Sequence, residues 1–178
     1  MGEIKPVETV KLFCGIIAVD EPAIARAQAE LEKFYGRIDH ESEIIPFTFT
    51  DYYREEMGDT LLRKLVSFEG LIDPGRIADI KLETNALEEQ LGEVREGSLR
   101  RRVNLDPGYL TPAKLILATT KDFAHRVYVG KGIYTELTLN FRKDGCTFFP
   151  WTYPDYQTEK YTAFFLAIRR LLLSQRKA

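Results

Sequence analysis

Along the first part of the chain, the spacing of apolar residues changes between that of a strand and that of a helix, and it predicts where these elements lie. An apolar run over Leu12–Val19 predicts a buried strand over Val10–Val19. A helix follows it, because Asp20 is a good N-cap, Pro22 stands in the first turn and Gly36 ends the pattern. The chain therefore begins with a strand and then a helix.

The next segments alternate with a period of two, which is typical of strands. The alternation predicts strands over Glu43–Thr50 and Leu61–Phe68, with a short helical turn over Asp51–Met57 between them. A loop over Gly92–Ser98 and a strand over Arg101–Asp106 come later in the chain. The dipeptide after Asp106 indicates that this strand ends in a turn.

A second helix starts at Asp73-Pro74, and its apolar residues recur three and four positions apart, as in a helix with one buried face. The buried positions are Ile77, Ile80, Thr84, Leu87 and Leu91. The outer face carries Lys81, Glu83, Glu88 and Glu89. The order over residues 1–106 is then strand, helix, strand, strand, helix, strand, which is that of a ferredoxin-like βαββαβ unit in an α+β fold with a mainly antiparallel sheet.

Residues 107–178 extend this unit within one predicted domain that spans residues 1–178. Pro112–Thr119 reads as a short helix. His125–Val129 and Ile133–Phe141 form a hairpin, and a last helix begins near Thr158. The aromatic segment Phe148–Tyr156 covers the core in one interpretation and stacks a nucleobase in the other.

Charge changes this picture, because it is sorted along the chain of 178 residues. The total is 25 Lys and Arg against 27 Asp and Glu, a net charge of −2. Residues 1–94 carry a balance of −10, residues 95–131 one of +5 and residues 132–178 one of +3. The acidic first half argues against a nucleic-acid binder, whose surface is basic.

The compartment is predicted from what the N-terminal region and the cysteines lack. The first apolar run, Leu12–Val19, is too short for a membrane span or a signal peptide. Cys14 and Cys146 lie far apart and neither belongs to a CxxC motif. We therefore expect a cytoplasmic protein with two free thiols.

Well-known catalytic and nucleotide-binding motifs do not occur. The pair Gly130-Lys131 is followed by Gly132, so a P-loop cannot form there. No HExxH, GxSxG or GxGxxG motif is present. With His40 and His125 as its two histidines, the chain cannot build a multi-histidine metal centre, and we expect no metal site.

A polar sheet face is the candidate site. A three-residue loop between the hairpin strands would set Arg126 opposite Glu136, and the strand at 101–106 would turn its even-numbered residues to the same side. Arginines bind phosphate or carboxylate through two hydrogen bonds, so the predicted ligand-binding residues are Arg102, Asn104, Lys121, Arg126, Tyr128 and Tyr134. Carboxylates and a histidine can move protons, so the predicted catalytic residues are Asp106, His125 and Glu136.

Other interpretations of these residues stay open. The polar face can be merely solvated, with Arg126 and Glu136 forming a weak cross-strand ion pair. His125 can be a structural histidine, and Asp106 can cap a turn. A partner subunit can also cover the face, because a ferredoxin-like sheet leaves one face free of its own helices.

Several segments together resemble a known family that is specific to prokaryotes. It is the family called domain of unknown function 4416, and the resemblance covers nearly the whole chain. The segments that carry it are Pro46–Tyr53, Glu56–Gly58, Asn104–Leu110, Ala118–Asp122, His125-Arg126, Gly132–Tyr134 and Pro150–Tyr156. The resemblance implies no activity or cofactor.

Two hypotheses of function follow. The first is a protein that binds, and in one version acts on, a phosphorylated or other anionic small molecule such as a nucleotide, without a P-loop. It requires the candidate residues to meet in one pocket. The second is a noncatalytic module that forms oligomers or associates with RNA through a basic stripe made of Arg100–Arg102 and the C-terminal arginines.

Overall fold

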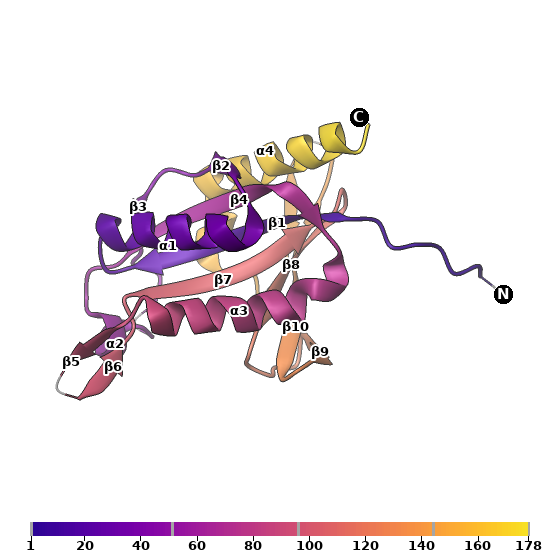
Figure 1. Ribbon diagram of the computed structural model, residues 1–178. Helices are drawn as coiled ribbons and strands as arrows, with labels where there is room; N and C mark the ends of the chain where they lie inside the picture. The colour runs from indigo at the N-terminus through magenta and orange to yellow at the C-terminus, as the bar shows by residue number, and fades with distance from the viewer. Residues whose placement is uncertain (1, 51, 96, 144, 178) are drawn as a thin grey trace.

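A mainly antiparallel sheet of nine strands forms the centre of the computed structural model, which describes residues 2–50, 52–95, 97–143 and 145–177 (Figure 1). In these residues the strand order is β11-β10-β8-β7-β1-β4-β2, while β3 pairs with β4 and β9 pairs with β10. The strands are β1 (Val10–Ala18), β2 (Ile38–Glu41), β3 (Ile45–Pro46), β4 (Leu62–Ile72), β7 (Val103–Leu110), β8 (Lys114–Thr119), β9 (Arg126–Gly130), β10 (Ile133–Phe141) and β11 (Cys146–Phe148). The predicted α+β class with a mainly antiparallel sheet is confirmed.

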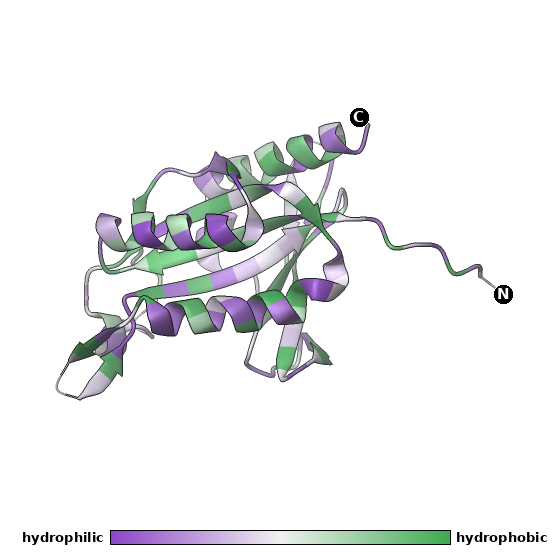
Figure 2. Cartoon of the chain, in the orientation of Figure 1, coloured by the Kyte–Doolittle hydropathy of each residue, from purple (hydrophilic) through white to green (hydrophobic). Residues whose placement is uncertain are grey.

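Helices cover both faces of this sheet. The helices are α1 (Glu21–Tyr35), α2 (Arg54–Met57), α3 (Ile77–Gln90) and α4 (Glu159–Gln175), with 3-10 turns η1 (Pro74–Arg76) and η2 (Pro154–Gln157). Leu12 and Cys14 of β1 pack beneath α1 and α3, whereas Phe13 packs beneath α4 on the other face. In Figure 2 the green of hydrophobic residues lies mainly on the central strands and on parts of α4. Within the described residues, no helix is both long and apolar enough to span a membrane.

The elements β1-α1-β2-β4-α3-β7 follow one another in the order of a ferredoxin-like unit. Both helices of this set lie on the same face of the sheet (Figure 1). This is the arrangement that the ferredoxin-like interpretation predicts. The strands β8 to β11 continue the sheet beyond β7, so the C-terminal extension adds to it rather than forming a second sheet.

The ends of the long helices agree with the sequence signals. The Asp20 side chain accepts a hydrogen bond of 2.7 Å from the backbone N–H of Ala23 and caps α1. Gly36 ends α1 with φ of 83°, a left-handed conformation that favours glycine. Thr158 caps α4 by accepting from the N–H of Tyr161.

The strand predicted over Glu43–Thr50 is wrong in extent. The chain pairs with β4 in two short pieces instead, β2 and β3, and β3 ends at Pro46, which has no N–H to add to the ladder. The N–H of Phe47 makes one more bond, to the carbonyl oxygen of Leu61. Phe47 then turns inward and packs against Ile17 on the face opposite α1. Of the helical turn predicted next, Arg54–Met57 forms α2, and Asp51 lies outside the described residues.

The short helix predicted over Pro112–Thr119 is also wrong. Lys114–Thr119 form β8 instead, which pairs with β7 on one side and β10 on the other. Leu115 and Leu117 are buried two positions apart, as in a strand. An apolar run of this length is compatible with either element, and the two neighbouring strands decide between them.

The turn expected at Asp106-Pro107-Gly108 is instead part of β7. Glycine is needed there for close packing, because a Cβ on Gly108 would lie 2.4 Å from the carbonyl oxygen of Ile116 in β8. The backbone nitrogens of Leu105 and Pro107 lie on the same edge of β7. On this edge the N–H of Leu105 donates to the side chain of Glu88 and not to a neighbouring strand. Since proline has no N–H, it leaves no donor unpaired at this position.

The hairpin β9–β10 has the predicted register. Arg126 lies opposite Glu136, and Tyr128 opposite Tyr134. A second hairpin replaces part of the loop expected over Gly92–Ser98, with β5 (Glu93–Arg95) pairing to β6 (Ser98–Arg100). Glu96 lies outside the described residues. This hairpin projects from the end of the molecule beside α2 (Figure 1).

Candidate functional site

A cleft of about 680 Å³ opens where the sheet splits between β7 and β8. The ladder that joins these two strands, both fully described, connects only Gly108–Leu110 to Leu115–Leu117. Asn104 and Asp106 on β7 and Ala118 and Thr119 on β8 therefore border a gap rather than each other. Concave spaces of this size, with a few polar groups that converge, are typical of small-molecule sites.

Arg63 forms the floor of the cleft and is only 4% exposed, although it belongs to the central strand β4. Its Nη1 donates to Asp106 at 3.0 Å and its Nη2 to the hydroxyl of Tyr156 at 3.1 Å. Its Nε lies 3.7 Å from Oδ2 of Asp155. A Cβ on Gly15 of β1 would lie 2.7 Å from Nη2, so glycine leaves the space that the guanidinium fills.

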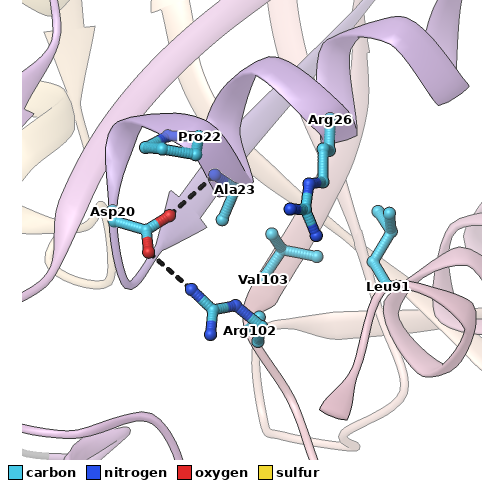
Figure 3. A pocket seen from close by; sticks show the side chains of 7 residues that line it. All are labelled: Asp20, Pro22, Ala23, Arg26, Leu91, Arg102 and Val103. Atoms are coloured by element: carbon cyan, nitrogen blue, oxygen red, sulfur yellow. Dashed lines mark hydrogen bonds and ion pairs between the residues drawn. The ribbon is translucent and has the colours of Figure 1, made fainter.

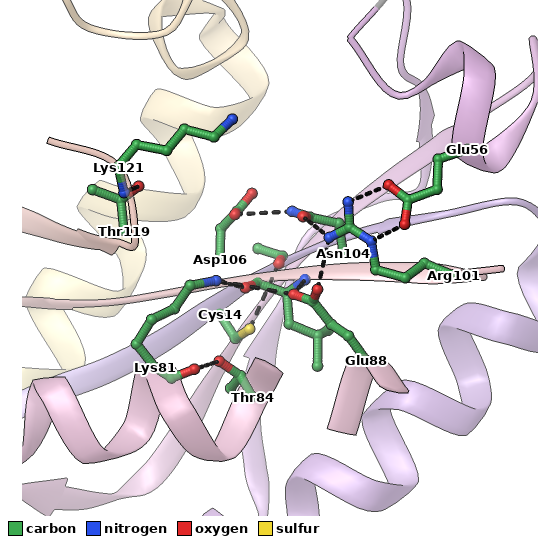
Figure 4. A network of polar contacts seen from close by, with 12 residues as sticks. Cys14, Glu56, Lys81, Thr84, Glu88, Arg101, Asn104, Asp106, Thr119 and Lys121 are labelled. Atoms are coloured by element: carbon green, nitrogen blue, oxygen red, sulfur yellow. Dashed lines mark hydrogen bonds and ion pairs between the residues drawn. The ribbon is translucent and has the colours of Figure 1, made fainter. Parts of the chain in front are cut away.

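Two charged side chains of α3 replace the missing strand beside β7 (Figure 4). Lys81 donates to the carbonyl oxygen of Leu105 at 2.7 Å, and Glu88 accepts from the N–H of Leu105 at 2.7 Å. Lys81 and Glu88 are 6% and 4% exposed, so the prediction that both lie on the outer face of the helix is wrong. They point inward because Leu105 has unpaired backbone groups at the split. Burial raises the pKa of Glu88, against the attraction of Lys81.

Arg101 ties α2 to this end of the cleft. Its guanidinium binds both carboxylate oxygens of Glu56, at 2.6 and 2.5 Å, and donates to Glu88 at 2.9 Å. Asn104 accepts from Arg101 at 3.3 Å and donates to Asp106 at 2.9 Å (Figure 4). A continuous chain of hydrogen bonds thus orients the Asp106 carboxylate from the α2 side.

Glu136 and Arg126 lie at the other end, where β9 and β10 reach the cleft. Arg126 donates from Nε to Glu136 at 2.9 Å and from Nη2 to the hydroxyl of Tyr153 at 3.3 Å. His125 contacts the same Glu136 oxygen at 3.2 Å but does not line the cleft. Its ring stacks on Trp151 with centroids 4.9 Å apart, so the histidine holds Glu136 from behind.

One side of the cleft is an aromatic wall, formed by Phe47, Phe49, Tyr52 and Tyr53. Tyr52 and Phe49 are 61% and 41% exposed. The ammonium group of Lys121, from the loop after β8, lies 3.7 Å from the centroid of the Tyr52 ring. The wall and the loop therefore meet through a cation–π contact.

The cleft brings together most of the residues that the sequence singled out. Those that line it are Asn104, Asp106, Lys121, Arg126 and Glu136. His125 reaches it only through its contact with Glu136.

Arg102 lies elsewhere, and its predicted place on the same face as Asp106 is wrong (Figure 3). It precedes the first residue of β7, in a bend, so the alternation of the strand does not extend to it. Its guanidinium donates to Asp20 at 2.5 Å and to Glu93 at 3.2 Å. Asp20 also caps α1, so Arg102 supports the start of that helix.

Tyr128 and Tyr134 also lie outside the cleft, although their register is as predicted. Tyr128 is 58% exposed, and its ring packs against that of Tyr134 with the two centroids 5.3 Å apart. A step of two residues along a strand covers about 7 Å, which carries this pair past the end of the cleft.

Arg63, Lys81, Glu88 and Arg101 line the cleft but were not predicted as site residues. Only Arg63 could have been noticed in the sequence. It stands between Leu61 and Leu65 at a spacing of two, so it is a charged residue on the buried face of a predicted strand. The other three depend on the contact of α3 with β7, which no local pattern announces.

Asp155 gives the site a testable pH dependence. It is 3% exposed, and its Oδ2 has no hydrogen-bond partner among the described residues. Burial raises its pKa, and the attraction of Arg63 opposes this shift. Because the folded chain then holds the proton more tightly than the unfolded chain, Asp155 contributes less to the free energy of unfolding as the pH rises above its ordinary value of 3.8.

We therefore expect Asp155→Asn to gain stability relative to the unmodified protein as the pH rises from 4 to 7. Urea unfolding of both proteins across this range measures the difference. A difference that shrinks with rising pH would mean that the attraction of Arg63 outweighs burial.

The described residues contain no group of three or more His, Cys, Asp and Glu side chains that could hold a metal ion.

A family model matches residues 8–171, and its description reads "Domain of unknown function (DUF4416)". No curated protein and no solved structure matches the chain.

Proposed function

The chain belongs to the family described as Domain of unknown function (DUF4416), a description that names no activity, and we propose from the cleft itself that the protein binds an anionic small molecule with a planar ring, such as a nucleotide. Three parts of the cleft support this proposal: a cation at its rim, an aromatic wall and a polar floor. Each of them fits one chemical group of such a ligand.

The observation that carries the proposal is the position of Lys121. It forms no ion pair with a described residue, and its ammonium lies over the Tyr52 ring. Thr119 and Thr120, directly before it, also line the cleft, and the Thr119 hydroxyl accepts from the N–H of Lys121. An ammonium group next to two hydroxyls is well suited to a phosphate or a carboxylate.

The aromatic wall supplies the second element. Tyr52, which contacts Lys121, and Phe49 both line the cleft and are exposed. Stacking on such rings stabilises a bound nucleobase by about 1–3 kcal/mol. A ring and an anionic group on one ligand can therefore bind the wall and the lysine together.

The floor supplies hydrogen-bond acceptors. Asp106 is held in place by Arg63 and Asn104, each through one of its oxygens. A carboxylate oxygen has two lone pairs, so both oxygens keep capacity for an O–H or N–H group of a ligand. Sugar hydroxyls and exocyclic amino groups are such donors.

The structure gives the RNA-associated alternative less support. That hypothesis depends on a basic stripe made of Arg100–Arg102 and the C-terminal arginines, of which Arg176 pairs with Glu8. Arg101 is bound to Glu56 and Glu88, and Arg102 to Asp20 and Glu93. Arginines that are already paired with carboxylates add little attraction for a phosphate backbone.

Replacing Lys121 by Met tests the proposal. We expect the affinity for a nucleoside monophosphate to fall about tenfold or more, because one charge-assisted hydrogen bond is lost. Stability should change by less than about 1 kcal/mol, since an exposed cation–π contact contributes no more. Calorimetric titration with the four ribonucleoside 5′-monophosphates, after a thermal-shift screen, measures the affinity.

The matched control is Lys114→Met, at the first residue of β8, whose other end leads to the loop of Lys121; Lys114 lies outside the cleft. It should bind as the unmodified protein does. Equal affinity of the Lys121 variant and the unmodified protein, or an equal loss in both variants, would contradict the proposal.

A further inference from the structure

The charges that line the cleft are balanced. Among the described residues there are five basic and five acidic side chains. The basic ones are Arg63, Lys81, Arg101, Lys121 and Arg126. The acidic ones are Glu88, Glu89, Asp106, Glu136 and Asp155. A cleft built for a polyanion would carry a clear excess of positive charge.

Four of the five cations are already occupied. Arg63 lies between Asp106 and Asp155, at 3.0 and 3.7 Å. The pair Arg126–Glu136 closes one end of the cleft at 2.9 Å.

At the other end, Glu88 forms ion pairs with Arg101 and Lys81, with nitrogen–oxygen distances of 2.9 and 3.9 Å. Lys81 also holds the Leu105 carbonyl (Figure 4). The charge of these four cations is already compensated by carboxylates, so they add little net attraction for a ligand anion unless a buried ion pair breaks, which is strongly unfavourable.

Lys121 is the exception, because it can bind an anion without breaking an ion pair with any described residue. A second or third phosphate would extend from Lys121 toward the floor or the ends of the cleft. There it would come near Asp106 and Asp155, two carboxylates that share a single guanidinium, that of Arg63. Placing like charges side by side at a binding surface costs several kcal/mol.

We infer that the cleft is selective for a ligand with a single anionic group, of the nucleoside monophosphate class, and that it discriminates against di- and triphosphates. This inference rests on the proposed function and names its ligand class. Lys121 holds the one anionic group, the aromatic wall stacks the ring, and Asp106 accepts from a hydroxyl or amino group.

The test is a series of nucleoside, nucleoside monophosphate, diphosphate and triphosphate that share one base, titrated at constant ionic strength without divalent cations. The base is the one that binds best as a monophosphate. We expect the monophosphate to bind at least about tenfold more tightly than the triphosphate, and more tightly than the nucleoside. In Lys121→Met its advantage over the nucleoside should disappear, and in Lys114→Met it should persist.

The possible results separate the two proposals. Affinity that rises with the number of phosphates would overturn the selectivity and leave anion binding in place. Equal affinity for nucleoside and monophosphate would overturn the assignment of Lys121 as the anion site. Absence of binding by any member of the series would overturn the proposed function and the inference together.

Discussion

Replacing Arg63 by Met is expected to lower the free energy of unfolding by about 3–5 kcal/mol, the usual cost of removing one partner of a buried ion pair. Asp106 and Asp155 would lose the cation that lies between them. The hydroxyl of Tyr156, which is fully buried, would also lose its donor. Methionine fills a similar length of space, so the loss arises from charge more than from a cavity.

Urea unfolding measures this effect, with Arg26→Met as the control. Arg26 is exposed on α1, away from the cleft, and its replacement should change stability by less than about 0.5 kcal/mol. If Arg63→Met lost less than about 1 kcal/mol, the buried network would not be what holds the floor of the cleft. Adding Asp106→Asn and Asp155→Asn should restore part of the loss, since no buried carboxylate would then lack a cation.

Replacing Lys81 by Met is expected to cost about 1–3 kcal/mol, because the Leu105 carbonyl would be left without a donor at the split in the sheet. Glu88 would also lose a cation at 3.9 Å while remaining buried. The loss should be local as well as global. The amide of Leu105, which donates to Glu88, should exchange its hydrogen faster than in the unmodified protein.

Hydrogen exchange and urea unfolding test this expectation together. Lys33→Met, at an exposed position of α1, is the control and should leave both measurements unchanged. Unchanged exchange at Leu105 in Lys81→Met would contradict the view that α3 replaces a strand beside β7.

Local signals predicted the elements whose ends or periods are self-contained. α1 begins after Asp20 and ends before Gly36, as expected. The register that sets Arg126 opposite Glu136 follows from the hairpin alone. The errors lie where a neighbour decides. Leu115 and Leu117 form a strand because β7 and β10 flank them, and Gly108 lies within β7 because β8 packs against it.

The candidate site was predicted in part for the same reason. Asp106 and Glu136 were found from strand alternation, which also misplaced Arg102 because that residue precedes the strand. Lys81 and Glu88 read as outer residues of a helix, and only the split between β7 and β8 explains why they are buried. Side chains that serve an unpaired backbone do not follow the amphipathic pattern of their own helix.

The central claim is that the cleft between β7 and β8 binds an anionic ligand with a ring. A two-dimensional ¹H–¹⁵N spectrum, titrated with a nucleoside monophosphate, tests it most directly. We expect saturable shifts at the amides of Thr119, Thr120 and Lys121, together with Tyr52 and Tyr53 of the aromatic wall. Shifts confined to residues outside the cleft, or no saturable shift at millimolar ligand, would contradict it.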